Sequence, residues 1–389
     1  MTKKAVLYNA KLVLPDQTVS GAVILSNGNI SDIDIGNSIC ENGIDCRGDY
    51  LIPGLIEIHT DNLEKYIVPR PGILWPYTEA SLIAHDNQIF GSGITTVFDA
   101  ISIGLTDSSE VRTKIIDKSI NAVKKTQEEK LLRADHYIHL RCELPSSTVY
   151  NIFLKYVDEP LLRFVSLMDH TVGQRQWRDI RKWKLYYSDR KWTDEDASAE
   201  IEKRERLHME YANKNRKKIM NICNILNIPT ASHDDTLPEH CYEAWKNGVT
   251  ISEFPTTLEA AIEAKKLGMK TIMGAPNMIR GESHSGNISA ISLVENNLLD
   301  GFSSDYMPIS LLHAAFQLHT QVGMALHRAI KMVTSNIAQM VNLNDRGSLE
   351  KGKISDIVRV KIVDNLPVVK AIWKNGNLIN SSIDHFTNN

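Results

Sequence analysis

The stretch LIPGLIEIHTD (residues 51–61) is the most informative about the fold, because it joins a short apolar run to a polar end. An apolar run of this length, ended by His59 and Asp61, indicates a buried strand over Leu51–His59. Seven similar runs follow, at residues 95–100, 137–143, 163–170, 229–233, 249–254, 269–274 and 301–305. Helical patterns lie between them, such as those at 110–128, 258–267 and 311–340. Alternating strands and helices predict a (β/α)8 barrel of the TIM type, of the metal-dependent hydrolase kind, over residues 51–344.

A doubly wound parallel sheet is the competing architecture. It typically has a glycine-rich G-x-G-x-x-G turn after an early strand, and the sequence contains no such turn. The two ends of the chain carry short β-prone runs, each with an Asn-Gly turn, at residues 27–28 and 375–376. We therefore predict one small β-sandwich domain assembled from residues 1–50 and 345–389.

Composition restricts the partners of the chain. Its 389 residues include 44 Lys and Arg against 47 Asp and Glu, a formal net charge of −3, which argues against nucleic acid as a partner. No apolar run reaches the roughly 18 residues of a transmembrane helix, and the N-terminus reads as a strand, so no membrane partner is expected. Five cysteines without C-x-x-C spacing favour a reducing cytoplasm over a disulfide framework. The expected partner is a small molecule, and a homo-oligomer is left open.

Metal-type side chains gather at the ends of the predicted barrel strands. They are His59 and Asp61 after the first strand, Glu143 on the third, His170 on the fourth, His233 on the fifth and Asp305 on the eighth. These strand ends meet on one face of a barrel. Because imidazole and carboxylate ligands suit Zn, Mn or Fe, the sequence predicts one or two divalent metal ions there.

Two of these residues have alternative interpretations. Glu143 shares a strand face with His139 and Arg141, so Arg141 is a second candidate partner for its charge. Asp61 either binds metal, orients His59 or contacts substrate. His139 and His136 lie deeper along the strand and are interpreted as structural.

Basic and glycine-rich segments indicate an anionic ligand. Residues 274–287 combine glycines with Arg280, His284 and Ser285 ahead of a predicted helix start near residue 287, a pattern that suits phosphate. Residues 170–191 interleave basic side chains, Arg175 among them, with Trp and Tyr. We interpret them as a flap over a polyanion, with a solvated surface hairpin as the alternative. Lys65 and Arg70 add positive charge on the same face.

The stretch IPGLIEIH (52–59), the late aspartate and the split β domain resemble the amidohydrolase superfamily. The usual H-x-H motif of that superfamily reads His-Thr-Asp here. Several motifs together resemble one branch, the alpha-D-ribose 1-methylphosphonate 5-triphosphate diphosphatases of the carbon–phosphorus lyase pathway. These motifs lie at residues 59–76, 139–144, 166–177, 231–236, 253–257, 273–287 and 303–308.

The resemblance implies a role for each candidate ligand. His59, with Asp61 beside it, is expected at the more buried metal, and Glu143 is expected to bridge where many relatives use a carboxylated lysine. The second metal is expected on His170 and His233. Asp305 is expected to bind metal and to accept the proton of the attacking water. The superfamily spacing would put Glu143 on the fourth barrel strand, whereas counting along this sequence puts it on the third.

The resemblance also implies a substrate, a phosphorylated ribose phosphonate that is hydrolysed to pyrophosphate and the 5-phosphate. Two other functions compete with this prediction. The first is an amidohydrolase acting on a cyclic amide, an N-acyl group or a nucleobase, which would need fewer cationic residues around its pocket. The second is a catalytically silent barrel used as a scaffold, which would be expected to lose metal ligands.

Overall fold

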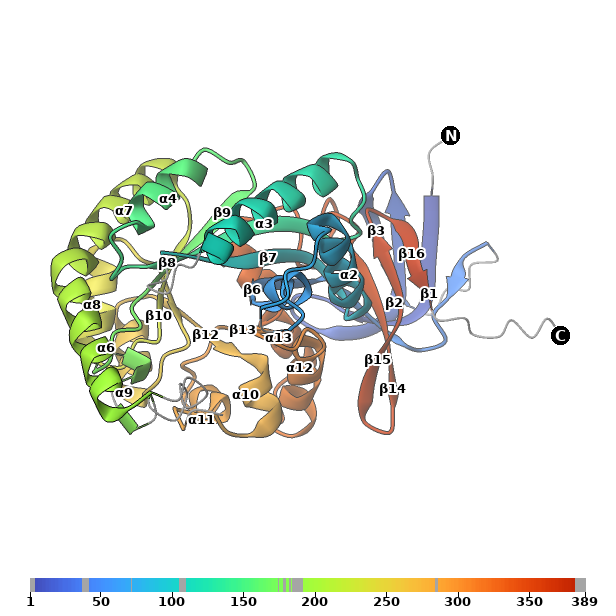
Figure 1. The fold of residues 1–389 in the computed structure, drawn as a ribbon. Coiled ribbons are helices and arrows are strands. Elements are labelled where there is room, and N and C mark those ends of the chain that lie inside the picture. The colour runs from blue at the N-terminus through green and yellow to red at the C-terminus, as the bar shows by residue number, and fades with distance from the viewer. Residues whose placement is uncertain are drawn as a thin grey trace.

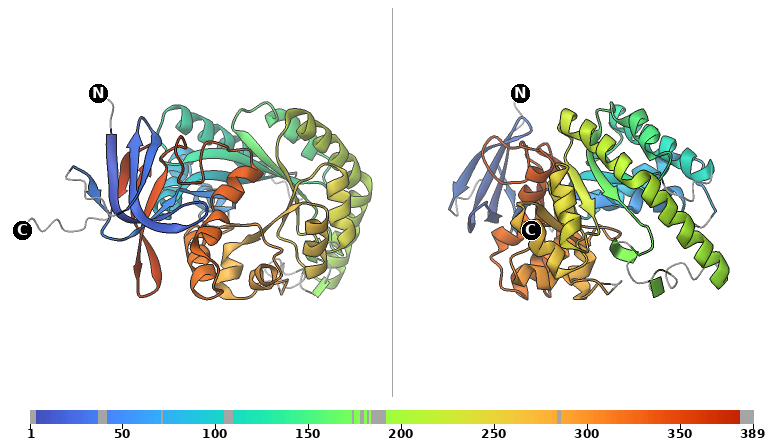
Figure 2. Two further views of the ribbon diagram at one scale, coloured as in Figure 1. Left: turned by 180° about the vertical axis from the view of Figure 1, so that it is seen from behind. Right: turned by 90° about the vertical axis from the view of Figure 1, so that its left-hand side faces the viewer.

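The computed structural model describes residues 4–36, 42–70, 72–104, 110–173, 175–177, 180–181, 183, 192–283 and 286–381. These residues form a parallel barrel and a separate antiparallel-rich sheet, which lies at one end of the barrel (Figures 1 and 2). The predicted (β/α)8 barrel with a β domain from both ends of the chain is confirmed. None of the described helices is long and apolar enough to cross a membrane.

The barrel contains eight parallel strands that pair in chain order. They are β6 (Leu55–Thr60), β7 (Ile94–Ile103), β8 (Asp135–Glu143), β9 (Leu162–Met168), β10 (Thr230–His233), β11 (Ile251–Glu253), β12 (Lys270–Gly274) and β13 (Gly301–Ser303). Between β13 and β6, backbone hydrogen bonds join Asp305 N to His59 O and Asp61 N to Asp305 O, each 3.1 Å long. This short bridge nearly closes the barrel and brings the two ends of the predicted metal site together.

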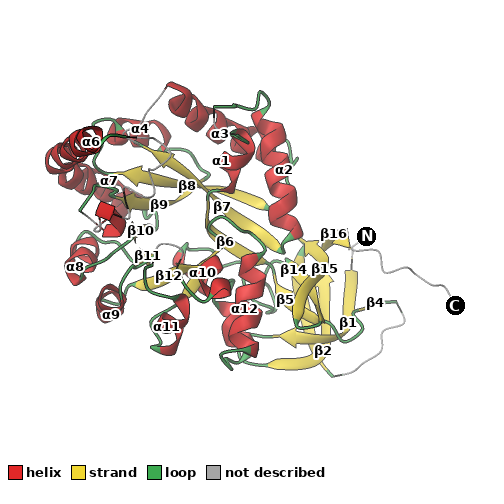
Figure 3. Ribbon diagram, turned by 60° about the horizontal axis from the view of Figure 1, so that its bottom comes forward, coloured by secondary structure: helices red, strands yellow, loops and turns green. Residues whose placement is uncertain are grey.

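Helices surround the strands on the outside (Figure 3). Following the strands in order, they are α1 (Asn62–Ile67), α2 (Thr78–Gly91), α3 (Glu110–Glu128), α4 (Val149–Tyr156), α6 (Asp194–Leu207), α7 (Asn213–Leu226), α8 (Pro238–Lys246), α9 (Leu258–Lys266), α10 (Ala275–Arg280), α11 (Ala290–Glu295), α12 (Ser310–Thr320), α13 (Leu326–Lys331) and α14 (Ser335–Met340). A 3-10 turn covers Arg175–Trp177, and the π-helical segment His208–Ala212 joins α6 to α7. The single helix predicted over residues 311–340 is wrong: the chain forms α12, α13 and α14 there, and Gly323 adopts a left-handed φ of 77° between the first two.

The inside of the barrel is filled below the predicted site. Ile56, Ile58, Phe98 and Phe164 belong to one buried cluster with residues of β10, β11 and β12. His139 on β8 packs its ring against Phe164, with 4.4 Å between the centroids. The barrel is therefore a packed core, and polar chemistry is confined to the ends of its strands.

The second sheet has the order β16-β15-β14-β5-β1-β2-β3, with β4 paired to β1. Its strands are β1 (Lys4–Val13), β2 (Thr18–Ser26), β3 (Asn29–Ile35), β4 (Ile44–Asp45), β5 (Tyr50–Pro53), β14 (Ile357–Val363), β15 (Leu366–Lys374) and β16 (Asn377–Ser381). Both predicted Asn-Gly turns form. Each of their four residues, Asn27, Gly28, Asn375 and Gly376, has a positive φ, as such turns require. The predicted sandwich is thus one continuous sheet folded over a single core, in which Leu25 and Trp373 share one cluster.

The strand predicted over Leu51–His59 is two strands in two different sheets. β5 pairs with β14 in the small sheet, and β6 opens the barrel. Gly54 lies between them, where an added Cβ would come within 2.1 Å of Thr95 Oγ1. Only glycine fits this close approach, which the apolar pattern alone could not indicate.

Candidate metal centre

The barrel brings together most of the predicted ligands on one face. His59 is the last residue but one of β6 and Asp61 lies just beyond that strand, while Glu143 ends β8 and His233 ends β10. His170 follows β9 and Asp305 follows β13. The structure therefore keeps Glu143 on the third barrel strand, as counted along the sequence, and not on the fourth.

The first half-site consists of His59, Asp61 and Asp305, whose ligand atoms all lie within 4.8 Å of one another. His59 Nε2 is buried and lies 3.6 Å from Asp61 Oδ1, and none of the residues that the structure describes forms a hydrogen bond with it. A buried imidazole nitrogen without a partner is costly unless something binds it. The nitrogen and two carboxylates match the donor set of a divalent transition metal, so these residues fit the metal that the sequence predicts.

The second half-site consists of His170, His233 and Asp234, again with ligand atoms within 4.8 Å of one another. His233 Nε2 lies 3.5 Å from Asp234 Oδ2, and the rings of His170 and His233 meet edge to face at 6.0 Å. Asp234 was not predicted from the sequence, although it directly follows a predicted ligand. Its φ of 56° is unusual for a non-glycine residue and marks a strained strand end.

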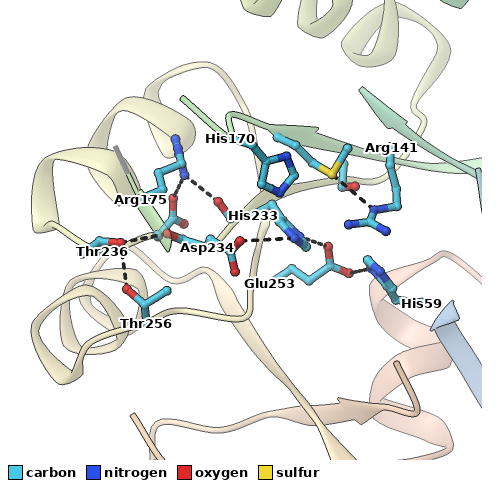
Figure 4. A network of polar contacts seen from close by, with 12 residues as sticks. His59, Arg141, His170, Arg175, His233, Asp234, Thr236, Glu253 and Thr256 are labelled. Carbon is cyan, nitrogen blue, oxygen red and sulfur yellow. Dashed lines mark hydrogen bonds and ion pairs between the residues drawn. The ribbon is translucent and has the colours of Figure 1, made fainter. Parts of the chain in front are cut away.

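Glu253 connects the two half-sites and is the main residue that the sequence analysis missed. Its fully buried carboxylate accepts hydrogen bonds from His59 Nδ1 and His233 Nδ1, each at 2.8 Å (Figure 4). A proton held on Nδ1 leaves the Nε2 lone pair of each ring for a metal. The sequence contained the signal, because Glu253 lies near the end of the predicted sixth strand, 249–254. The other candidate ligands were identified by the same position at the end of a strand.

Electrostatics at the first half-site follow from these contacts. Burial alone would lower the pKa of His59, but the Glu253 charge outweighs burial and raises the pKa. A metal on Nε2 would have to displace the second proton of the ring, so metal binding there would release a proton. Burial likewise opposes ionisation of Asp61, yet the Arg141 guanidinium holds the pKa of that carboxyl far below its usual range. Asp61 is therefore charged at neutral pH, with Arg141 Nη1 donating to its Oδ1 at 2.5 Å.

Glu143 lies against His170. Its Oε1 accepts a hydrogen bond from the His170 backbone N–H at 2.8 Å, and its Oε2 contacts His170 Nδ1 at 2.6 Å. The carboxylate thus orients the ring and keeps Nε2 available. Glu143 belongs to neither half-site among the described residues, and its role as a bridging ligand remains a prediction.

The two deeper histidines behave as structural residues. Both ring nitrogens of His139 have partners, Ile58 O at 3.1 Å and Ser166 Oγ at 2.8 Å. His136 belongs to a separate buried network, where Asp99 contacts it at 2.7 Å and contacts His85 at 2.8 Å. That network lies between α2 and the outer face of β7 and β8, away from the strand ends.

The predicted basic residues differ in their position relative to the strand ends. Lys65 and Arg70 are exposed, and Lys65 Nζ lies 3.4 Å from the carbonyl of Tyr306, one residue past Asp305. Arg280 is exposed and ends α10, and the helix start predicted near residue 287 is found at Ala290, ten residues further along. His284 and Ser285 lie outside the described residues.

Arg175 differs most from expectation. It was predicted on an exposed flap, but it is only 7% exposed, and its Nη1 bonds Asp235 Oδ1 at 2.5 Å and His233 O at 2.8 Å. Trp177 and Trp183, predicted to face a polyanion, are buried in a small cluster with Ala197 of α6. Arg175, Trp177 and Trp183 are thus buried, whereas Ile180 and Arg181 are exposed.

Comparisons with known proteins show the family and the fold of the chain. A family model described as the amidohydrolase family matches residues 50–384. The chain is 42% identical over 375 residues to an alpha-D-ribose 1-methylphosphonate 5-triphosphate diphosphatase of Escherichia coli K12, covering 95% of this chain and 99% of that protein. It is 23% identical to an adenine deaminase of Clostridium perfringens, covering 93% of this chain and 56% of that one. The structure of a 5-methylcytosine deaminase from Klebsiella pneumoniae covers 98% of both chains, with a TM-score of 0.67 at 14% identity.

Proposed function

The chain belongs to the amidohydrolase family, and from this premise we propose that it hydrolyses alpha-D-ribose 1-methylphosphonate 5-triphosphate. The products are pyrophosphate and 5-phospho-alpha-D-ribose 1-methylphosphonate, in phosphonate catabolism. The observation that carries the proposal is the similarity to the Escherichia coli diphosphatase over nearly the whole of both chains. The two half-sites and the cationic residues beside them support the same chemistry.

The residues of the two half-sites would hold Zn, Mn or Fe, because mixed imidazole and carboxylate ligation suits all three. Such an ion, when bound, lowers the pKa of a water ligand to about 7 and stabilises charge on phosphoryl oxygens. Glu253 and Glu143 hold the imidazole rings in the tautomer and orientation that ligation requires.

Asp305 is the proposed proton acceptor for the attacking water. Its backbone is fixed to β6 by the two hydrogen bonds of the barrel seam, so its position is tied to that of His59. The side chain is half-buried, with access to the mouth of the barrel. A carboxylate in that position takes a proton without leaving the first half-site.

The exposed cations at the mouth are proposed substrate-binding residues. Lys65 lies beside the loop that follows Asp305, which places its ammonium at the rim of the half-site. Arg70 lies three residues past the end of α1, and Arg280 ends α10. Three cations suit a triphosphate, whereas a neutral cyclic amide or a nucleobase has no charge for them to neutralise.

A substrate panel tests this proposal against deamination, which the similarity to adenine deaminase makes the second candidate. Purified protein is assayed with the ribose triphosphate, its 5-diphosphate analogue and adenine, before and after prolonged chelation. We expect turnover of the triphosphate, loss of activity on chelation and recovery with a divalent transition metal. Turnover of adenine alone, or full activity in protein shown by elemental analysis to be metal-free, would overturn the proposal.

A further inference from the structure

Arg141 is a charged side chain inside the mouth of the barrel. The proposed function gives it no role in binding substrate or metal. Alternation along β8 points it inward with His139 and Glu143, while Leu140 and Cys142 pack outward in the helix-facing core. Its side chain is 13% exposed. Figure 4 shows the guanidinium near both His59 and His170, and its charge opposes the raised pKa of each.

The guanidinium is incompletely satisfied. Arginine carries five N–H donors. Nη1 donates to Asp61 Oδ1 at 2.5 Å, and Nε donates to Met168 Sδ at 3.2 Å, which is a weak thioether acceptor. Nη2 makes no hydrogen bond to any described residue, yet it is not among the fully buried atoms without a partner. One edge of the guanidinium is therefore open to solvent.

An open cation in this place is not explained by metal binding alone. A guanidinium stays charged at all working pH values, and it repels a divalent cation held by the neighbouring half-site. An anion placed between them would satisfy the open edge and screen the repulsion. A phosphoryl group does both, because its oxygens match the planar fork of arginine.

We propose that Arg141 is a substrate-binding residue whose open edge receives oxygens of a phosphoryl group while Nη1 remains on Asp61. This inference rests on the proposed function, since it assigns one residue of the same site to the phosphate chain. It also separates two roles that look alike in the structure, holding Asp61 in place and holding the substrate.

The test measures binding of inorganic pyrophosphate by calorimetry, with free metal ion at a fixed excess, and metal content by elemental analysis. Arg141→Lys keeps the charge and loses the fork, and Arg141→Gln loses both. We expect pyrophosphate affinity to fall about 10-fold in the first and about 100-fold in the second, with metal content unchanged. Arg359→Lys is the matched control, because Arg359 forms a similarly buried pair with Asp49 in the small sheet.

Each result decides the matter. Unchanged pyrophosphate affinity in Arg141→Lys, with turnover of the ribose triphosphate by the unaltered chain, overturns the role of Arg141 and leaves the proposed function standing. Loss of metal in both variants, with normal pyrophosphate affinity per loaded centre, would make Arg141 a holder of Asp61 only. Failure of the unaltered chain to hydrolyse the triphosphate overturns the proposed function, while the pyrophosphate titration still decides whether Arg141 binds phosphate. If Arg141→Gln does not fold, Arg141→Lys carries the test.

Discussion

Replacing Glu253 with Gln should disable one half of the metal centre while preserving the shape of the side chain. The carboxylate accepts two hydrogen bonds of 2.8 Å, from His59 Nδ1 and His233 Nδ1. An amide has one acceptor oxygen, and its NH2 group would face the second Nδ1–H donor. That ring must lose its hydrogen bond or move its proton to Nε2, the atom that points into its half-site.

The size of the effect follows from this geometry. Loss of a group that orients a metal-binding histidine typically weakens metal affinity by about 10- to 100-fold. This corresponds to about 1.4–2.8 kcal/mol at one of the two half-sites. If a buried N–H donor is left without an acceptor, the protein also loses about 1–3 kcal/mol of folding stability.

The assay is elemental analysis of metal per chain after dialysis against graded concentrations of a chelator. Glu253→Gln should release one class of metal at lower chelator than the unaltered protein. Asp356→Asn is the control, because Asp356 is a buried carboxylate paired with Lys374 in the small sheet, remote from the barrel mouth. Release curves of Glu253→Gln and the unaltered protein that coincide would refute the reasoning.

Three further predictions follow from single residues. Asp305→Asn should lower kcat by about 10²- to 10⁴-fold while largely keeping metal content, and near-normal kcat at metal saturation would remove Asp305 from the proton-acceptor role. Arg175→Ala should leave the Asp235 carboxylate buried and unpaired, at a cost of about 3–5 kcal/mol that lowers the thermal midpoint with little dependence on salt; a raised KM at an unchanged midpoint would instead make Arg175 a substrate-binding residue. Burial lowers the pKa of His136, but Asp99 outweighs it and the pKa rises from 6.5 to about 9. The stability from this pair is thus present below about pH 6.5 and lost as pH rises through 9, up to about 3 kcal/mol. The thermal midpoint should therefore drop more between pH 6.5 and pH 9.5 in the unaltered protein than in His136→Gln. An equal drop in the two proteins would contradict this prediction.

Much of the site was predictable from local pattern. The alternation of β8 correctly placed His139, Arg141 and Glu143 on one face, because the period of a strand is two residues. The strand-end rule located His59, His233 and Asp305 on the same face of the barrel, because parallel strands converge there. The same rule applied to Glu253 would have found it as well.

What failed depends on contacts between residues distant in sequence. The break at Gly54 is set by Thr95, a residue on the next barrel strand. The burial of Arg175 is set by Asp235, 60 residues further along. Neither contact affects the local pattern of charge or hydrophobicity. The sequence pattern therefore predicted one continuous strand through Gly54, and it predicted an exposed flap where Arg175 forms a buried ion pair.

The central claim is that the metal centre releases pyrophosphate from a ribose 5-triphosphate. Phosphorus NMR of the metal-loaded protein with alpha-D-ribose 1-methylphosphonate 5-triphosphate tests it most directly, because the technique resolves every phosphorus product. We predict one pyrophosphate per substrate consumed, a new 5-phosphate signal and an unchanged methylphosphonate signal, all abolished by chelation. Release of orthophosphate in place of pyrophosphate, or an intact triphosphate in the presence of fully loaded protein, would contradict the claim.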